Sequence, residues 1–193
     1  MMKFLVVIED NRGSVHRMSK EAIAGAQKLG GNVTALVLGA NAESLAQELS
    51  SVEIDKTLIV NHDMVLTYNS DGYTEVVTKV IQSIDPDVII AGHSYQTRDF
   101  MPRVSARLDI PFIPDVTMVD GDNYTKQVLN AKLNCTISSS SEKKILSFQS
   151  ACFSEEDMQS GSSNSQTIDI DLDSPTARSI SEEPFQESAS EVD

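Results

Sequence analysis

A short polar segment after a predicted strand gathers the side chains best suited to binding or catalysis. Within eight residues it carries an imidazole, a hydroxyl, a guanidinium and a carboxylate: the residues are Gly92, His93, Ser94, Arg98 and Asp99. Doubly wound sheets bind ligands beyond the carboxyl ends of their strands, so this loop is a candidate site for an anion or a partner protein. An ordinary strand-to-helix connection, with Gly92 serving the turn, explains the same residues and stays open.

Two arginines follow the loop. Arg103 and Arg107 are four residues apart, so in a helix starting at Pro102 they share one face. Like charges at this spacing disfavour the helix slightly unless an acid neutralises them. A partner interface and a merely solvated face both fit, and we carry the two arginines as candidate interface residues.

The sequence lacks the glycine-rich turn that holds a dinucleotide. Backbone N–H groups approach a pyrophosphate closely in a Gly-x-Gly-x-x-Gly turn or a P-loop, and neither motif occurs among the nine glycines. The turn after the first predicted strand instead carries Glu9 and Asp10, whose carboxylates repel phosphate. Binding of AMP or ATP at the Gly92 loop is kept as the alternative function, that of a small nucleotide-binding α/β protein.

No catalytic constellation is predicted. His16, His62 and His93 are far apart in the sequence, no Gly-x-Ser-x-Gly turn occurs, and we expect turn or surface roles for the first two histidines. Cys135 and Cys152 lack the spacing of metal ligands, so no metal site is expected. We expect Cys135, in a strand-like stretch, to lie in the core and Cys152 to be exposed.

Residues 1–150 provide the elements that must position these side chains. Apolar, β-branched runs predict strands at 3–8, 32–38, 56–60 and 87–91. Apolar residues at helical spacing predict helices at 14–29, 42–50 and 71–84, and a fourth starting at Pro102. Strand-like pieces follow at 115–119, 124–130 and 144–148, with a hairpin turn at 121–123. The predicted fold class is α/β, a doubly wound, largely parallel sheet with an antiparallel addition near its end.

Residues 151–193 differ from the rest in composition. They hold eleven acidic residues, one basic residue and many serines. Their scattered apolar residues bury too little surface to offset the entropy of ordering, so we expect a folded domain at 1–150 and an acidic linker or disordered tail at 151–193. Apolar and acidic residues alternate over 167–173, a pattern that could add an edge strand to a partner.

Charge and hydropathy exclude several classes of protein. The formal net charge is −14, which disfavours binding to nucleic acid or to anionic lipid. No apolar run approaches the ~20 residues of a membrane-spanning helix, and the N-terminus enters a strand rather than a signal or transit peptide. With its two cysteines, the chain is predicted to be a bacterial-type cytoplasmic protein without membrane insertion.

Two blocks of sequence resemble the amino-terminal domain of the electron transfer flavoprotein alpha subunit. The first covers residues 2–9 and 26–39, a strand, a helix end with Gly30-Gly31, and a second strand. The second is more specific: residues 87–94, 99–109 and 114–116 are similar in content and spacing to the family's strand, loop and "PRVAAKLD" helix. In this chain Thr97-Arg98-Asp99 stands where the family tends to have Gly-Lys-Asp.

The resemblance implies a Rossmann-like fold, of adenine-nucleotide-hydrolase type, that docks a beta subunit during electron transfer from flavin dehydrogenases. In this family FAD is held by a separate carboxy-terminal domain, which is expected to be missing here. We therefore expect a truncated or split alpha subunit that is a binding module rather than an enzyme and has no cofactor of its own. Its expected partners are the beta subunit and a separate flavin-domain chain.

Overall fold

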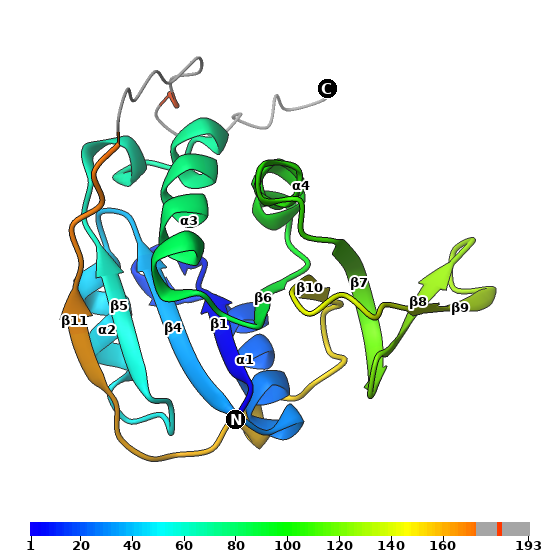
Figure 1. Cartoon of the computed structure of the whole chain (residues 1–193). Helices are drawn as coiled ribbons and strands as arrows, with labels where there is room; N and C mark the ends of the chain where they lie inside the picture. Colours follow the sequence, from blue (N-terminus) through cyan, green and yellow to red (C-terminus); the bar gives the residue numbers. More distant parts are fainter. Residues whose placement is uncertain (173–180, 183–193) are drawn as a thin grey trace, which may run out of the picture.

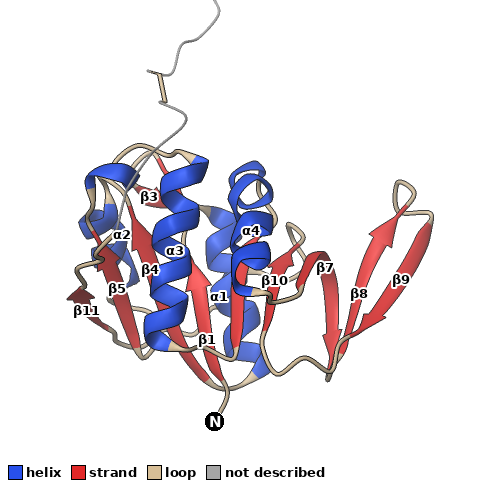
Figure 2. Cartoon of the chain, turned by 45° about the horizontal axis from the view of Figure 1, so that its top comes forward, coloured by secondary structure: helices blue, strands red, loops and turns tan. Residues whose placement is uncertain are grey.

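The computed structural model describes residues 1–172 and 181–182, and within them one mixed sheet carries helices on both faces (Figures 1 and 2). The helices are Arg17–Leu29 (α1), Ala42–Leu49 (α2), Ser70–Ile84 (α3) and Tyr95–Leu108 (α4), with short 3-10 helices at Asp63–Val65 (η1) and Glu155–Asp157 (η2). The strands of the sheet are Lys3–Val7 (β1), Asn32–Leu38 (β4), Lys56–Val60 (β5), Val88–Gly92 (β6), Phe112–Asp120 (β7), Asn123–Val128 (β8), Leu133–Ser138 (β9), Lys144–Phe148 (β10) and Asn164–Thr167 (β11). A separate small hairpin joins Asp10–Asn11 (β2) to Ser14–Val15 (β3).

The sheet reverses its direction of growth at β1. Among the described residues the strand order is β11-β5-β4-β1-β6-β10-β7-β8-β9. Neighbouring strands are parallel from β11 to β7, whereas β8 and β9 are antiparallel to their neighbours. The predicted α/β class, with a doubly wound, largely parallel sheet and an antiparallel addition, is confirmed.

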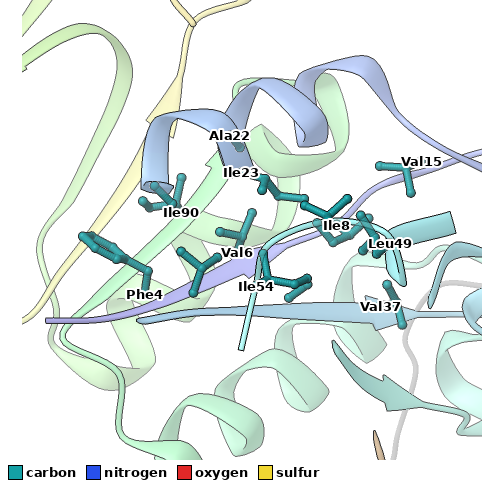
Figure 3. Close-up of a cluster of buried hydrophobic side chains, with 14 of the residues drawn as sticks. Phe4, Val6, Ile8, Val15, Ala22, Ile23, Val37, Leu49, Ile54 and Ile90 are labelled. Carbon is teal, nitrogen blue, oxygen red and sulfur yellow. The ribbon is translucent and has the colours of Figure 1, made fainter. Parts of the chain in front are cut away.

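The central strands are buried on both faces, because successive side chains of a strand point to opposite sides of the sheet. Helices α1 and α2 cover one face and helices α3 and α4 the other (Figures 1 and 2). The first core cluster includes Phe4, Val6, Ile23 and Leu49 (Figure 3), and the second includes Leu5, Val7, Val76 and Phe100. The sheet is therefore a rigid platform that fixes where each strand end lies.

Helix α4 begins at Tyr95, so the predicted start at Pro102 is wrong. Ser94 caps the helix, because its side chain accepts a hydrogen bond from the Thr97 N–H at 3.1 Å. Pro102 lies inside the helix and removes one backbone hydrogen bond, which the burial of Phe100 on the sheet offsets. Arg98 and Asp99 are consequently helical residues, not loop residues.

Strand β9 was not among the predicted strands. It pairs antiparallel with β8, and the two form a ribbon, residues 123–138, that extends past the layer of helices (Figure 1). Because no helix covers this ribbon, Cys135 on β9 is exposed, and the prediction that it lies in the core is wrong. Its residues do alternate, with apolar Leu133, Cys135 and Ile137 between polar ones, which is the pattern of a half-buried strand, yet only Ile137 is partly buried.

Residues 151–172 contact the folded sheet. The Ala151 N–H donates to Glu21 of α1 at 2.9 Å, and the Phe153 ring lies 4.8 Å from that of Phe148. Cys152 is partly buried rather than exposed, and this burial raises the pKa of its thiol to about 12, with the charges of Glu21 and Asp115 adding to the effect.

The alternating segment at 167–173, predicted as a possible edge strand for a partner, does not form that strand in its described part. The strand β11 is Asn164–Thr167, which shares only Thr167 with that segment and pairs parallel with β5 of this chain's own sheet. Residue 173 lies outside the described residues. The division into a folded domain at 1–150 and a linker at 151–193 stays a prediction.

Candidate functional site

Gly92 ends β6 where Met18 of α1 packs against it. A Cβ atom at this position would lie 2.5 Å from the Cβ of Met18 and 3.1 Å from the Met18 carbonyl carbon. Its φ angle is not in the left-handed region. The glycine is thus explained by close packing of a helix on a strand rather than by the turn that follows it.

His93 connects the ends of three neighbouring strands. Its Nδ1 lies 2.8 Å from Ser147 Oγ on β10, and its Nε2 lies 4.0 Å from Asp115 Oδ1 on β7. Burial lowers the pKa of His93, and the positive charges of Arg98 and Lys126 act in the same direction, while Asp115 opposes them. The imidazole is therefore held neutral at neutral pH.

The side-chain types in this cluster are those of a hydrolytic triad, but their geometry differs from one. Ser147 is fully buried, so its hydroxyl cannot reach a substrate. The 4.0 Å separation of His93 and Asp115 is also longer than a hydrogen bond. The geometry is that of a structural link between β6, β10 and β7.

Asp99 and Ser94 are both engaged with the residues around α4. Ser94 caps the helix, as described above, and Asp99 accepts a hydrogen bond from the Tyr68 hydroxyl at 2.7 Å. Burial, the hydrogen bond to Asp99 and that residue's charge all raise the pKa of Tyr68. These contacts fasten the start of α4 to the segment before α3.

Arg103 and Arg107 lie on one face of α4, as their spacing predicts, and that face meets α3. Arg103 contacts Asp71 at 3.2 Å, and Arg107 contacts Glu75 at 2.8 Å. The acids of α3 therefore neutralise the like charges, although both arginine side chains stay more than two fifths exposed. Arg98 lies instead against the ring of Tyr95, 5.4 Å from its centroid, and both of these residues are exposed.

The turn after β1 is acidic and closed by its own hydrogen bonds. Asp10 accepts from the Gly13 N–H at 2.6 Å and from Asn41 Nδ2 at 2.7 Å. Burial raises the pKa of Tyr73 to about 12, with the charges of Asp10 and Glu9 adding to the effect and a hydrogen bond to Gln96 opposing it. Negative charge at the switch point between β1 and β6 disfavours a phosphate there.

His16 and His62 have the turn roles expected of them. Each accepts a hydrogen bond through Nδ1 from the backbone N–H two residues later, at 3.2 Å for His16 and 3.1 Å for His62. His16 thereby caps α1 and His62 caps η1.

Sequence reasoning missed the exposed apolar side chains near the antiparallel end of the sheet. Met118 on β7 is 56% exposed, Leu129 in the turn of the ribbon is 68% exposed, and Leu133 on β9 is 56% exposed. The turn between β8 and β9, which carries Leu129, has positive φ angles at Leu129, Asn130 and Ala131. Asn130 was the available signal, because asparagine tolerates this conformation, but the predicted strand ran through it.

The described residues contain neither a candidate metal site nor a candidate membrane-spanning helix. In this part of the chain no group of three or more His, Cys, Asp or Glu side chains could hold a metal ion. No described helix is both long enough and apolar enough to cross a membrane.

Residues 4–173 match the family model described as "Electron transfer flavoprotein domain". The electron transfer flavoprotein subunit alpha of Bacillus subtilis is 33% identical over 136 residues, which are 67% of this chain and 42% of that protein. A probable mitochondrial alpha subunit of Caenorhabditis elegans is 32% identical over 151 residues, 77% of this chain and 46% of the relative.

A third relative has a different name. The acryloyl-CoA reductase electron transfer subunit beta of Anaerotignum propionicum is 31% identical over 121 residues, 61% of this chain and 33% of that protein. The chain spans about two fifths of the length of three bacterial alpha subunits that it matches.

Proposed function

The chain belongs to the electron transfer flavoprotein family, and we propose that it is an alpha-type subunit whose own task is to dock a beta subunit. Its relatives are named as subunits of electron carriers, which supports a role in electron transfer rather than in catalysis. In this proposal, the complex of this chain with its beta subunit accepts electrons from flavin dehydrogenases. A cytoplasmic location is part of the same proposal.

The observation that carries the proposal is the uncovered ribbon of β8 and β9. It projects from the body of the molecule (Figure 2) and bears Leu129 and Leu133, while the outer edge of β9 has no neighbouring strand among the described residues. Long strand edges and clustered apolar side chains are normally covered, since they otherwise promote aggregation. A beta subunit that covers the ribbon would satisfy both features.

The candidate loop is proposed as a second part of the same interface. His93 lies against Asp115 of β7, the strand from which the ribbon continues, so the loop and the ribbon share one end of the sheet. Arg98 and Tyr95 are exposed beside it. Arg103 and Arg107, which are also candidates, form ion pairs with acidic residues of α3. Only the exposed parts of their side chains would contact a partner.

FAD is the cofactor of the family, and we propose that this region does not hold it. The acidic Glu9–Gly13 turn, and the capping of α4 by Ser94, leave no cradle of backbone N–H groups at the switch point. The flavin would be bound by a flavin domain, whether in the same protein or in a separate chain. The docking role is the same in either case.

Co-expression with a beta subunit of an electron transfer flavoprotein tests the proposal. We expect a complex that survives gel filtration, and we expect the double variant Leu129→Lys, Leu133→Lys to weaken it by about tenfold or more, since central apolar residues carry most of the energy of an interface. Leu66→Lys is the matched control, because Leu66 is also exposed but lies far along the chain from the ribbon. A complex that forms equally well with the ribbon variant contradicts this surface.

Calorimetric titration with AMP, ATP and FAD separates docking from the alternative. Docking predicts no tight binding of any of the three by this chain. A submicromolar affinity for AMP or ATP, abolished by substitution of Ser94 or Arg98, would instead establish a nucleotide-binding protein that uses the Gly92 loop.

A further inference from the structure

A cavity lies at the opposite end of the sheet from the candidate loop. It is a hollow of about 370 Å³ between the amino ends of β1, β6 and β10, the end of α1 and the turn that joins β7 to β8. Its walls are mostly apolar and include Phe4, Leu29, Val88, Val119, Tyr124 and Leu146. The volume falls at the small end of the range of about 300–1,000 Å³ that ligand pockets occupy.

One buried cation points into this apolar space. The side chain of Lys144, the first residue of β10, is only 8% exposed, and its Nζ lies 5.7 Å from the centroid of the Tyr124 ring. The ammonium donates to Asp122 Oδ1 at 2.9 Å and to the Ser139 carbonyl at 3.4 Å. A buried ammonium is costly without an anionic partner, so this site requires a carboxylate.

The carboxylate that pairs with Lys144 is that of Asp122, which is exposed to solvent. The Asp122 side chain is 72% exposed, and it belongs to the two-residue turn between β7 and β8. Its neighbour Gly121 has a φ of +57° and open space around it. Moving Asp122 away from Lys144 therefore returns a carboxylate to water without disturbing packed side chains.

The ammonium stays charged in this setting. Burial lowers the pKa of Lys144, but the hydrogen bonds and charges of Asp122 and Tyr124 raise it by more, so that the net direction is upward. Lys143, the preceding residue, is exposed to solvent to a much greater extent and pairs with Asp85 outside the cavity. The two adjacent lysines thus differ in burial and in surroundings.

We propose that this cavity binds a small monocarboxylate with an apolar aromatic or aliphatic body, whose carboxylate replaces that of Asp122 on Lys144 while its body fills the space beside Tyr124 and Leu146. The cavity shares Tyr124 with the ribbon, but Tyr124 lies four residues along β8 from Val128, the residue that pairs with Leu133 of the docking surface. The cavity would add a small-ligand site to a subunit proposed to act through protein contacts.

Calorimetric and NMR titrations of the full chain with benzoate and hexanoate test this site. Benzyl alcohol and hexanol serve as neutral probes of the same shape. We expect saturable binding of at least one carboxylate, with shifts in the Tyr124 ring signals, and at least about tenfold weaker binding of the matching alcohol. The site is refuted if neither carboxylate saturates the protein by about 10 mM, or if the alcohols bind as well.

Two substitutions should act in opposite directions. Lys144→Met removes the anchor and is expected to weaken carboxylate binding by about tenfold or more, whereas Asp122→Asn removes the internal competitor and should strengthen it by about threefold or more. Lys143→Met is the matched control and should leave binding unchanged. If Lys144→Met does not fold, Asp122→Asn still decides: unchanged or weaker binding by that variant overturns the proposal.

Discussion

His93 is the residue of the candidate loop whose chemistry depends most on the fold. Its lowered pKa means that the unfolded chain takes up a proton near pH 6.5 while the folded chain does not. The free energy of unfolding should therefore decrease as the pH falls below 6.5, until the lower pKa of the folded state is passed.

An NMR titration of the histidine ring protons checks this prediction, with His93→Gln used to assign the signal. The imidazole of His93 should titrate below pH 6.5 in the folded protein, and the variant should lose the corresponding part of the pH dependence of stability. Titration at or above pH 6.5 would show that burial does not dominate at this site.

The two cysteines should react at very different rates. Cys135 is exposed on β9, whereas Cys152 is partly buried and its thiol has a pKa of about 12. Since the thiolate is the reactive form, one thiol per chain should react rapidly with a disulfide reagent at neutral pH and the other only after unfolding. Cys135→Ser should abolish the rapid phase, and two equally fast thiols in the native protein would be inconsistent with the position of Cys152.

At the residue level, the sequence located the polar cluster but did not predict which residues its members contact. The group at 92–99 does lie at the end of β6. The roles of Gly92 and His93, however, depend on Met18 and Ser147, which are distant in the sequence and leave no local signal. For the same reason, Lys144 could not be distinguished in the sequence from an ordinary residue at the end of a strand.

At the level of the helices, the ion pairs between α3 and α4 can be tested for their contribution to stability. Arg103 and Arg107 face acids of α3, but all four side chains keep some contact with solvent, so the pairs should contribute little to stability. Arg103→Gln and Arg107→Gln should each lower the free energy of unfolding by less than about 1 kcal/mol.

Urea denaturation measures these effects, and Phe100→Ala provides the comparison. Phe100 lies on the same helix and is buried, so its truncation should cost about 3–5 kcal/mol. A loss above about 2 kcal/mol for either arginine variant would mean that the pairs are a structural requirement rather than a solvated face.

Strand β11 covers the edge of β5, and its removal should destabilise the whole sheet. A chain ending at residue 150 would expose that edge and remove Phe153 from Phe148. We expect it to unfold at lower urea than the full chain, with a loss of about 2 kcal/mol or more, and to self-associate in gel filtration.

A chain ending at residue 172 is the control for this truncation, because it keeps β11 and the contacts of Phe153. Its unfolding midpoint should lie well above that of the chain ending at 150. Equal stability of the chain ending at 150 would support a domain boundary there, as the composition predicts.

The elements predicted best were those with a strong apolar period. Strands β1, β4, β5 and β6 and helices α1 to α3 lie where their buried residues place them, with ends shifted by a few residues. Prediction failed where a capping residue overrode a proline, as at Ser94 and Pro102, and at β9, whose alternating apolar residues indicate a strand but stay mostly exposed. Neither the cap nor the exposure of β9 follows from hydrophobic periodicity.

On the scale of the whole molecule, the two edges of the described sheet differ in their side chains. The sheet ends at β11, whose side chains are all polar, on one side and at β9, with exposed Leu129 and Leu133 nearby, on the other. The alternation of strands and helices was enough to predict the doubly wound architecture. The asymmetry of its two edges was not predictable, because it depends on which distant segments return to the sheet.

Sedimentation velocity, followed at both protein and flavin wavelengths, tests the central claim most directly. It should be run on this chain alone, on a beta subunit alone, and on their mixture. The account predicts a 1:1 complex in the mixture, and an isolated chain of 193 residues that sediments without flavin absorbance. A chain that carries stoichiometric flavin by itself, or that sediments unchanged in the presence of the beta subunit, would contradict it.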